Sequence, residues 1–117
     1  MMQGATVSLF IIGTEITRGI IGDKHAPLMA RELSQLGFMV NRITLVPDDG
    51  SLGGILADCV QVADIVLVTG GLGPTSDDMT RNVVASLAGV PLECDEHSYD
   101  ELYERIGERI HGANKRQ

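Results

Sequence analysis

The sequence has few aromatic residues and few positive charges. Its 117 residues include two Phe, two Tyr and no Trp, and nine Lys and Arg stand against sixteen Asp and Glu, a formal net charge of −7. Neutralising a phosphate backbone requires clustered cations, and the nine cations here are dispersed, so the sequence disfavours nucleic acid as a partner. Tyr99 and Tyr103 share one helical stripe, which indicates core residues more than a platform for stacking bases.

Long apolar runs, a basic leader and paired cysteines are also missing. No run approaches the ~18 apolar residues that cross a bilayer, and residues 1–6 lack the basic region of a secretory signal. We therefore expect a cytoplasmic protein with no membrane partner. Cys59 and Cys94 lack CxxC spacing, so we expect buried free thiols and neither a zinc site nor a disulfide. The histidines are too widely spaced for a metal site and are interpreted as surface or capping residues: His25, His97 and His111.

Apolar residues make up 44% of the chain and alternate between short runs and helical stripes. This pattern predicts one α/β domain over residues 1–117, with a mainly parallel sheet and helices on both faces. Strands are expected at 7–12, 38–46, 65–68 and 90–92. A first helix should begin between Asp23 and Pro27 and stop at Gly37, and later helices should span 51–63, 77–88 and 96–110. The apolar strand 65–68 favours a central position, whereas polar residues put strand 38–46 nearer an edge.

Each later helix carries an apolar stripe that should face the core. In helix 51–63, which Ser51 can cap, the stripe is Leu52, Ile55, Leu56, Cys59, Val60 and Ala63. The stripes of the next two helices are Val83, Val84, Leu87 and Ala88, and Tyr99, Leu102, Tyr103, Ile106 and Ile110.

The segment from Thr69 to Thr80 is the most informative part of the sequence. Ligands of open parallel sheets lie beyond the carboxyl ends of strands, and glycines let a phosphate reach backbone N–H groups. Asp77 and Asp78 beside such a cradle would repel a phosphate unless a cation lay between them, which indicates Mg²⁺ or a similar hard ion. The segment is neither a Walker loop nor a good dinucleotide fingerprint. Its candidate ligand-binding residues are Gly70, Gly71, Gly73, Thr75, Ser76 and Thr80.

Plain structural roles remain open for the same acids. Thr75 and Asp78 can form a capping box, and acids in a first turn stabilise any helix through its dipole. Glu15 can be a solvated loop residue. Asp48 and Asp49, which precede the expected helix 51–63, can be helix-start acids.

Three motifs resemble those of the CinA amino-terminal domain, within the molybdopterin-binding superfamily that includes MoaB and MogA. Residues 70–80, GGLGPTSDDMT, resemble the signature GGLGPTxDDxT. Gly13-Thr14-Glu15 resembles the first-loop signature GTE, and residues 46–49, VPDD, resemble the second-loop pattern. The motifs occur in the order of the family, each after an expected strand.

The resemblance implies a MogA-like three-layer α/β/α sandwich that binds molybdopterin or a nucleotide pyrophosphate with a divalent cation. By motif position, Asp78 and Asp48 would be catalytic, and Asp77, Asp78 and Glu15 would hold the metal. Gly13 and Thr14 would join residues 70–80 in binding the ligand. The implied chemistry is adenylyl transfer to molybdopterin or cleavage of an ADP-ribose-type pyrophosphate, with the protein supplying positioning and charge neutralisation.

Residues 114–117 resemble the start of a family segment that continues with a strand, a Gly-rich loop and a closing helix. We therefore expect the carboxy-terminal part of the fold, and the deamidase domain of full-length CinA proteins, to be missing. Two hypotheses follow: a metal-dependent nucleotidyltransferase or ADP-ribose pyrophosphatase-like hydrolase, and a non-catalytic binding module or fragment. An incomplete sheet would leave apolar surface for another copy to cover, which favours a homo-oligomer.

Overall fold

A computed structural model describes residues 4–73 and 79–107 of the chain. Strands and helices alternate along most of this part, as the apolar pattern predicted. The elements in chain order are β1 (Thr6–Ile12), α1 (Thr14–Thr17), α2 (His25–Gln35), β2 (Met39–Val46), α3 (Leu52–Val62), β3 (Ile65–Thr69), α4 (Thr80–Ala88) and α5 (Glu96–Ile106).

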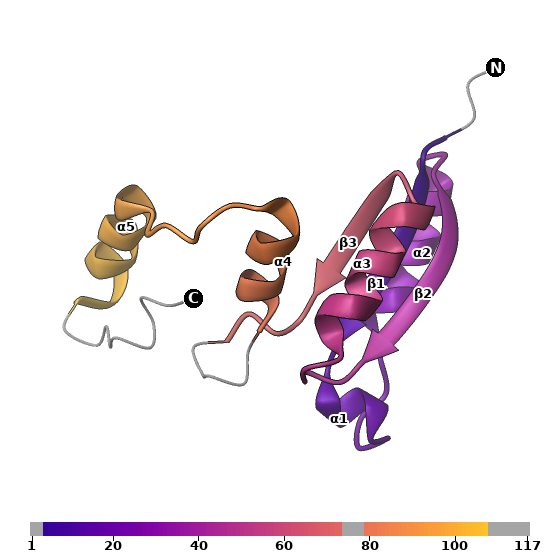
Figure 1. The fold of residues 1–117 in the computed structure, drawn as a ribbon, viewed down its shortest axis with the longest axis horizontal. Helices are drawn as coiled ribbons and strands as arrows, with labels where there is room; N and C mark the ends of the chain where they lie inside the picture. Colours follow the sequence, from indigo (N-terminus) through magenta and orange to yellow (C-terminus); the bar gives the residue numbers. More distant parts are fainter. Residues whose placement is uncertain (1–3, 74–78, 108–117) are drawn as a thin grey trace.

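The sheet of the described residues is parallel, in the order β2-β1-β3 (Figure 1). Ile12 of β1 pairs with Val46 of β2. Phe10 of β1 pairs with Thr44 of β2 on one side and with Val68 of β3 on the other. The predicted edge position of β2 is confirmed. The predicted central position of β3 is wrong for this part of the chain, because β3 pairs with β1 alone. Apolar residues suit a strand with helices on both faces and do not fix how many strands flank it.

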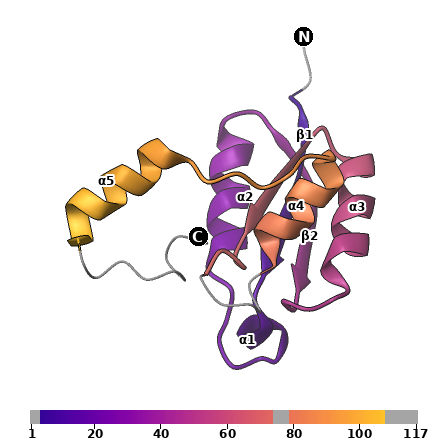
Figure 2. The same ribbon diagram turned by 60° about the vertical axis from the view of Figure 1, so that its left-hand side comes forward.

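Helices cover both faces of the sheet, which confirms the three-layer α/β/α sandwich (Figure 2). Successive β1 side chains point to opposite faces. On one face Val7, Leu9 and Ile11 pack against α2. On the other, Phe10 and Ile12 pack against α3 and α4 in a cluster completed by Val46, Leu52, Leu56 and Cys59. Each large side chain buried in this way contributes roughly 1.5–3 kcal/mol, so β1 is the main anchor of the fold.

The stripe predicted for α3 is partly confirmed. Leu52, Leu56 and Cys59 are buried, but Val60 is 47% exposed. Ser51 stands at the N-cap position without capping the helix, because its hydroxyl donates to the Asp49 carboxylate instead. The polar groups of the short turn before α3 therefore form hydrogen bonds with one another within the turn.

The last two helices expose apolar surface that the sequence placed in the core. In α4, Val83 packs on the core, but Val84 and Leu87 are each 43% exposed. α5 stands away from the sheet, none of its residues is buried, and Tyr103 is 53% exposed (Figures 1 and 2). An amphipathic stripe predicts which side of a helix is apolar, and burial requires a second surface against that side. Ile110 lies outside the described residues.

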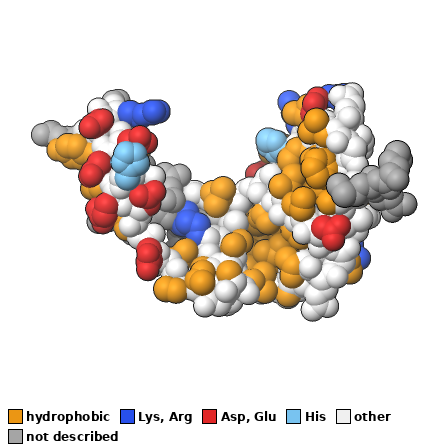
Figure 3. Space-filling model, turned by 90° about the horizontal axis from the view of Figure 1, so that it is seen from above, with side chains coloured by type: hydrophobic (Ala, Val, Ile, Leu, Met, Phe, Trp, Pro, Cys, Tyr) orange, Lys and Arg blue, Asp and Glu red, His pale blue; other side chains and the backbone are white. Residues whose placement is uncertain are grey.

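The connection between α4 and α5 also differs from the prediction. Gly89 ends α4 in the left-handed conformation, with φ 69°, as expected of a C-terminal glycine. Residues 90–92 form no strand, because this segment leads away from the sheet towards α5 (Figure 1). Hydrophobic side chains lie open on this part of the surface, beside the acidic α5 (Figure 3). No helix of the described residues is long and apolar enough to cross a membrane.

Candidate functional site

Loops that follow the three strands meet at one edge of the sheet, because parallel strands end on the same side. The backbone N–H of Gly13, after β1, donates to the Val46 carbonyl at 2.9 Å. The Asp48 N–H, after β2, donates to the Thr14 hydroxyl at 3.1 Å. Thr14 and Glu15 belong to α1, a short helix that the sequence did not predict. The first and second motifs are thus joined directly.

The glycines after β3 allow the third loop to approach the other two. Gly70 has φ 91°, and a Cβ on it would collide with the Ile12 carbonyl oxygen. Gly71 has φ 65°, and a Cβ there would collide with the Thr80 hydroxyl and lie 3.3 Å from Asp48 Oδ2. Both positions require glycine for conformation and for space. The third motif therefore comes into contact with Asp48.

Thr80 fastens the start of α4 to this glycine loop. Its hydroxyl donates to the Gly70 carbonyl at 2.6 Å, and its N–H donates to the Gly71 carbonyl at 3.2 Å. The residue is only 5% exposed. Its hydroxyl proton is therefore engaged within the protein, which gives Thr80 a structural part beside the predicted ligand-binding one.

Arg81 is a member of this region that the sequence analysis missed. Its guanidinium Nη1 donates to the Leu72 carbonyl at 3.1 Å and to the Gly73 carbonyl at 3.4 Å. These bonds bring a positive charge beside the glycine loop. The sequence feature that could have indicated Arg81 is its place directly after the motif of residues 70–80. A cation there can balance the negative charge of the two acids in that motif.

The neighbouring acids after β2 have different surroundings. Asp48 faces the glycine loop, and its Oδ1 accepts from the Met79 N–H at 3.4 Å. Asp49 turns to Ser51, whose hydroxyl and N–H donate to it and lower its pKa. The helix-start interpretation therefore describes Asp49, whereas Asp48 lies in the candidate site. The catalytic role of Asp48 stays a prediction.

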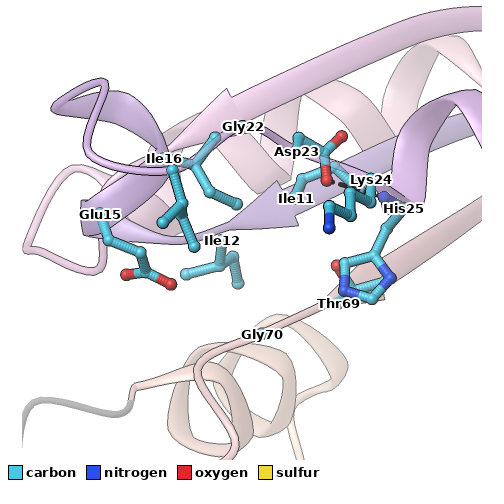
Figure 4. A pocket seen from close by; sticks show the side chains of 11 residues that line it. Ile11, Ile12, Glu15, Ile16, Gly22, Asp23, Lys24, His25, Thr69 and Gly70 are labelled. Atoms are coloured by element: carbon cyan, nitrogen blue, oxygen red, sulfur yellow. Dashed lines mark hydrogen bonds between the residues drawn. The ribbon is translucent and has the colours of Figure 1, made fainter.

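A pocket of about 610 Å³ opens beside the ends of β1 and β3 (Figure 4). Glu15 lies at one end of it, and Lys24, His25 and Thr69 lie at the other. Gly70 contributes to the wall, so the pocket adjoins the glycine loop. Lys24 was not predicted as a site residue. His25 is exposed, as its interpretation as a surface residue predicted, and it also lines the pocket. The sequence feature that could have indicated these two residues is a cation next to an imidazole, in the segment that connects the first motif to α2.

Only some of the predicted metal ligands lie among the residues that the structure describes. Within residues 4–73 and 79–107, no three His, Cys, Asp or Glu side chains lie close enough to hold a metal ion. Asp48 and Glu15 offer the hard carboxylate oxygens that Mg²⁺ prefers. The other predicted residues of the third motif lie outside the described residues, and their roles stay predictions: Thr75, Ser76, Asp77 and Asp78.

Comparison with known proteins finds relatives over almost the whole chain. A family model described as "Probable molybdopterin binding domain" matches residues 8–115. A CinA-like protein from Akkermansia muciniphila is 40% identical over 119 residues, covering 99% of this chain and 29% of that protein. The chain therefore spans less than a third of that relative's length.

Solved structures agree with the fold. A crystal structure of the protein CinA from Thermoplasma acidophilum, described as having unknown function, superposes with a TM-score of 0.86 at 28% identity, over 98% of this chain and 69% of that one. MoaB from Pyrococcus furiosus, described as a tungsten cofactor synthesizing protein, superposes with a TM-score of 0.68 at 29% identity, over 92% and 68% of the two chains. The resemblance read from the three motifs is confirmed.

Proposed function

The chain belongs to the family of probable molybdopterin binding domains, and we propose that it binds molybdopterin or a nucleotide pyrophosphate where the three strand-end loops meet. The observation that carries the proposal is the hydrogen bond from the Met79 N–H to Asp48 Oδ1 at 3.4 Å, which brings the second and third motifs together. A glycine-lined backbone beside a carboxylate suits an anionic ligand only when a cation accompanies it. The proposed ligand is therefore a phosphate-bearing molecule with Mg²⁺.

Each part of the site has a distinct task in this proposal. Backbone N–H groups of the glycine loop would hold the phosphate oxygens, and Arg81 would fix the path of that loop. Asp48 would offer a carboxylate oxygen to Mg²⁺, together with Glu15 and the predicted Asp77 and Asp78. When bound, the metal would neutralise charge on the phosphates. The chemistry best suited to such a site is adenylyl transfer or pyrophosphate hydrolysis, in which positioning provides most of the rate enhancement.

Turnover by the purified chain tests this proposal. We would incubate it with Mg²⁺ and either ADP-ribose, or ATP plus molybdopterin, and separate the products by chromatography. Asp48→Asn should lower the rate roughly 100-fold because it removes charge from the reacting region. Asp49→Asn is the matched control, since Asp49 bonds Ser51 and should leave the rate unchanged. Equal rates for the two variants would contradict the assignment of Asp48.

A binding module without turnover is the second candidate. It is favoured by the bond of the Thr80 hydroxyl to the Gly70 carbonyl, which gives a residue of the third motif a structural part. A ligand that binds only the folded chain raises its melting temperature by mass action. A melting shift with ADP-ribose or molybdopterin, without product formation, would support this candidate over the enzyme.

We also propose that copies of the chain associate. Apolar side chains around α4 are exposed to solvent in the single chain, and large exposed apolar patches mark interaction surfaces. The exposed residues concerned are Leu72, Val84, Leu87, Val90 and Leu92.

A further inference from the structure

The pocket beside the glycine loop has chemically different ends. Isoleucines line its middle, including Ile12 of β1 and Ile16 of α1 (Figure 4). The Glu15 carboxylate lies at one end, and the Lys24 ammonium and His25 ring lie at the other, beside the Asp23 carboxylate. An apolar wall between groups of opposite character orients a ligand that is itself apolar in the middle and unlike at its ends.

Lys24 makes no ion pair in the part of the chain that the structure describes, although the Asp23 carboxylate lines the same pocket. Its neighbour Asp23 is engaged elsewhere, because its two carboxylate oxygens accept from the N–H groups of His25 and Ala26, each at 3.0 Å. Asp23 thereby caps α2 and occupies the helix N–H groups that could otherwise bind an anion. An anion at this end of the pocket would therefore meet side chains, not the helix terminus.

Lys24 is also unusual for this chain. It is one of two lysines in a sequence with a net charge of −7. A flexible ammonium at the mouth of a pocket attracts phosphate or carboxylate groups as a point charge. The His25 ring adds a nitrogen donor, and Thr69 adds a hydroxyl at the same end.

We propose that the Lys24 and His25 end of this pocket binds the acidic substituent of a planar heterocyclic ligand. The ring lies against the isoleucines, and its donor-bearing edge faces Glu15, which accepts from amino or ring N–H groups through the oxygen that it does not offer to Mg²⁺. This inference rests on the proposed function and deepens it, since it assigns the ligand's orientation and makes Lys24 a specificity-determining residue. The acidic substituent can be a carboxylate or a phosphate, which share the chemistry that Lys24 recognises.

Matched ligand pairs test the assignment. We would measure dissociation constants calorimetrically for pterin against pterin-6-carboxylate, and for adenosine against AMP, at fixed ionic strength. Lys24→Gln should weaken the acidic member of a pair about tenfold and leave the uncharged member unchanged, because a charge-assisted hydrogen bond is lost. Lys24→Arg should keep the preference. Arg42→Gln, which removes an exposed cation of β2 outside the pocket, should leave both members unchanged. An equal effect of Lys24→Gln on both members would overturn the inference.

Amide chemical shifts separate this inference from the proposed function. During titration of the labelled chain with pterin-6-carboxylate or AMP, with and without Mg²⁺, the inference predicts shifts at Lys24, His25 and Thr69. The proposed function predicts shifts at Gly71 and Thr80. Shifts at the second group alone would overturn the inference and support the function, shifts at the first group alone would do the reverse, and no shifts at either would contradict both.

Discussion

The Asp64 carboxylate accepts hydrogen bonds from both the backbone N–H and the hydroxyl of Thr6, at 2.9 and 3.1 Å. In return, the Asp64 N–H donates to the Thr6 hydroxyl oxygen at 3.0 Å. Thr6 begins β1, and Asp64 directly precedes β3, so the pair fixes where the two strands start. The bond from the Thr6 N–H, followed by that from its hydroxyl, lowers the pKa of Asp64.

We predict that this pair makes the free energy of unfolding depend on pH in the acidic range. Because the pKa of Asp64 is lower in the folded chain, its contribution is present above roughly pH 4 and is lost as the pH falls through the folded pKa. Urea unfolding should show the natural chain more stable than Asp64→Asn at pH 7, with a smaller difference at pH 3. Asp58→Asn removes an exposed carboxylate of α3 and is the control. An Asp64→Asn difference that is unchanged between the two pH values would contradict the prediction.

We expect Gly70→Ala to destabilise the fold. The backbone at Gly70 has a positive φ, and the added methyl would collide with the Ile12 carbonyl oxygen in the central strand. The cost should be about 1–3 kcal/mol of unfolding free energy. Gly54→Ala is the matched control, because nothing lies within 4 Å of its added methyl, and it sits within α3. It should stabilise the chain by about 0.5–1 kcal/mol. If both variants shifted stability in the same direction, the steric argument would be wrong.

Local patterns in the sequence predicted those parts of the fold that depend on periodicity and backbone conformation. The buried run of β1 and the helix end at Gly89 follow from residue type alone. The exposure of Tyr103 and the edge position of β3 could not be predicted this way, because both depend on which surfaces lie nearby. Gly70, Gly71 and Asp48 were identified by motif. Lys24 and His25 were not, because their position depends on how the loop after α1 returns to the sheet.

The two cysteines should differ in reactivity. Cys59 is 1% exposed in the core between β1 and α3, whereas Cys94 is exposed between α4 and α5, which corrects the prediction that both are buried. A thiol reagent reaches an exposed cysteine directly and a buried one only after the structure opens. Titration of the folded chain with a chromogenic disulfide should give one fast thiol, and Cys94→Ser should abolish the fast phase. A fast phase that persists in Cys94→Ser would show that Cys59 is accessible.

Association of copies should be visible in the mass of the particle. Light scattering coupled to gel filtration should give a mass above the 12.5 kDa of one chain. Leu87→Glu places a charge in the exposed apolar surface of α4, and burial of an unpaired charge at an interface is costly, so this variant should shift the mass towards the monomer. Asn82→Glu adds the same charge at an exposed polar position of α4 and is the control. A monomeric natural chain would contradict the proposed association.

Thr80→Val tests whether the glycine loop depends on its bond to α4. Valine keeps the shape of threonine and removes the hydroxyl that donates to the Gly70 carbonyl at 2.6 Å. Because Thr80 is almost fully buried, the carbonyl would lose its partner without gaining water, at a cost of about 1–3 kcal/mol. Thr80→Ser keeps the hydroxyl and should cost less. Urea unfolding measures both, and a Thr80→Val chain as stable as Thr80→Ser would mean that the loop is held by other contacts, such as those of Arg81 with Leu72 and Gly73.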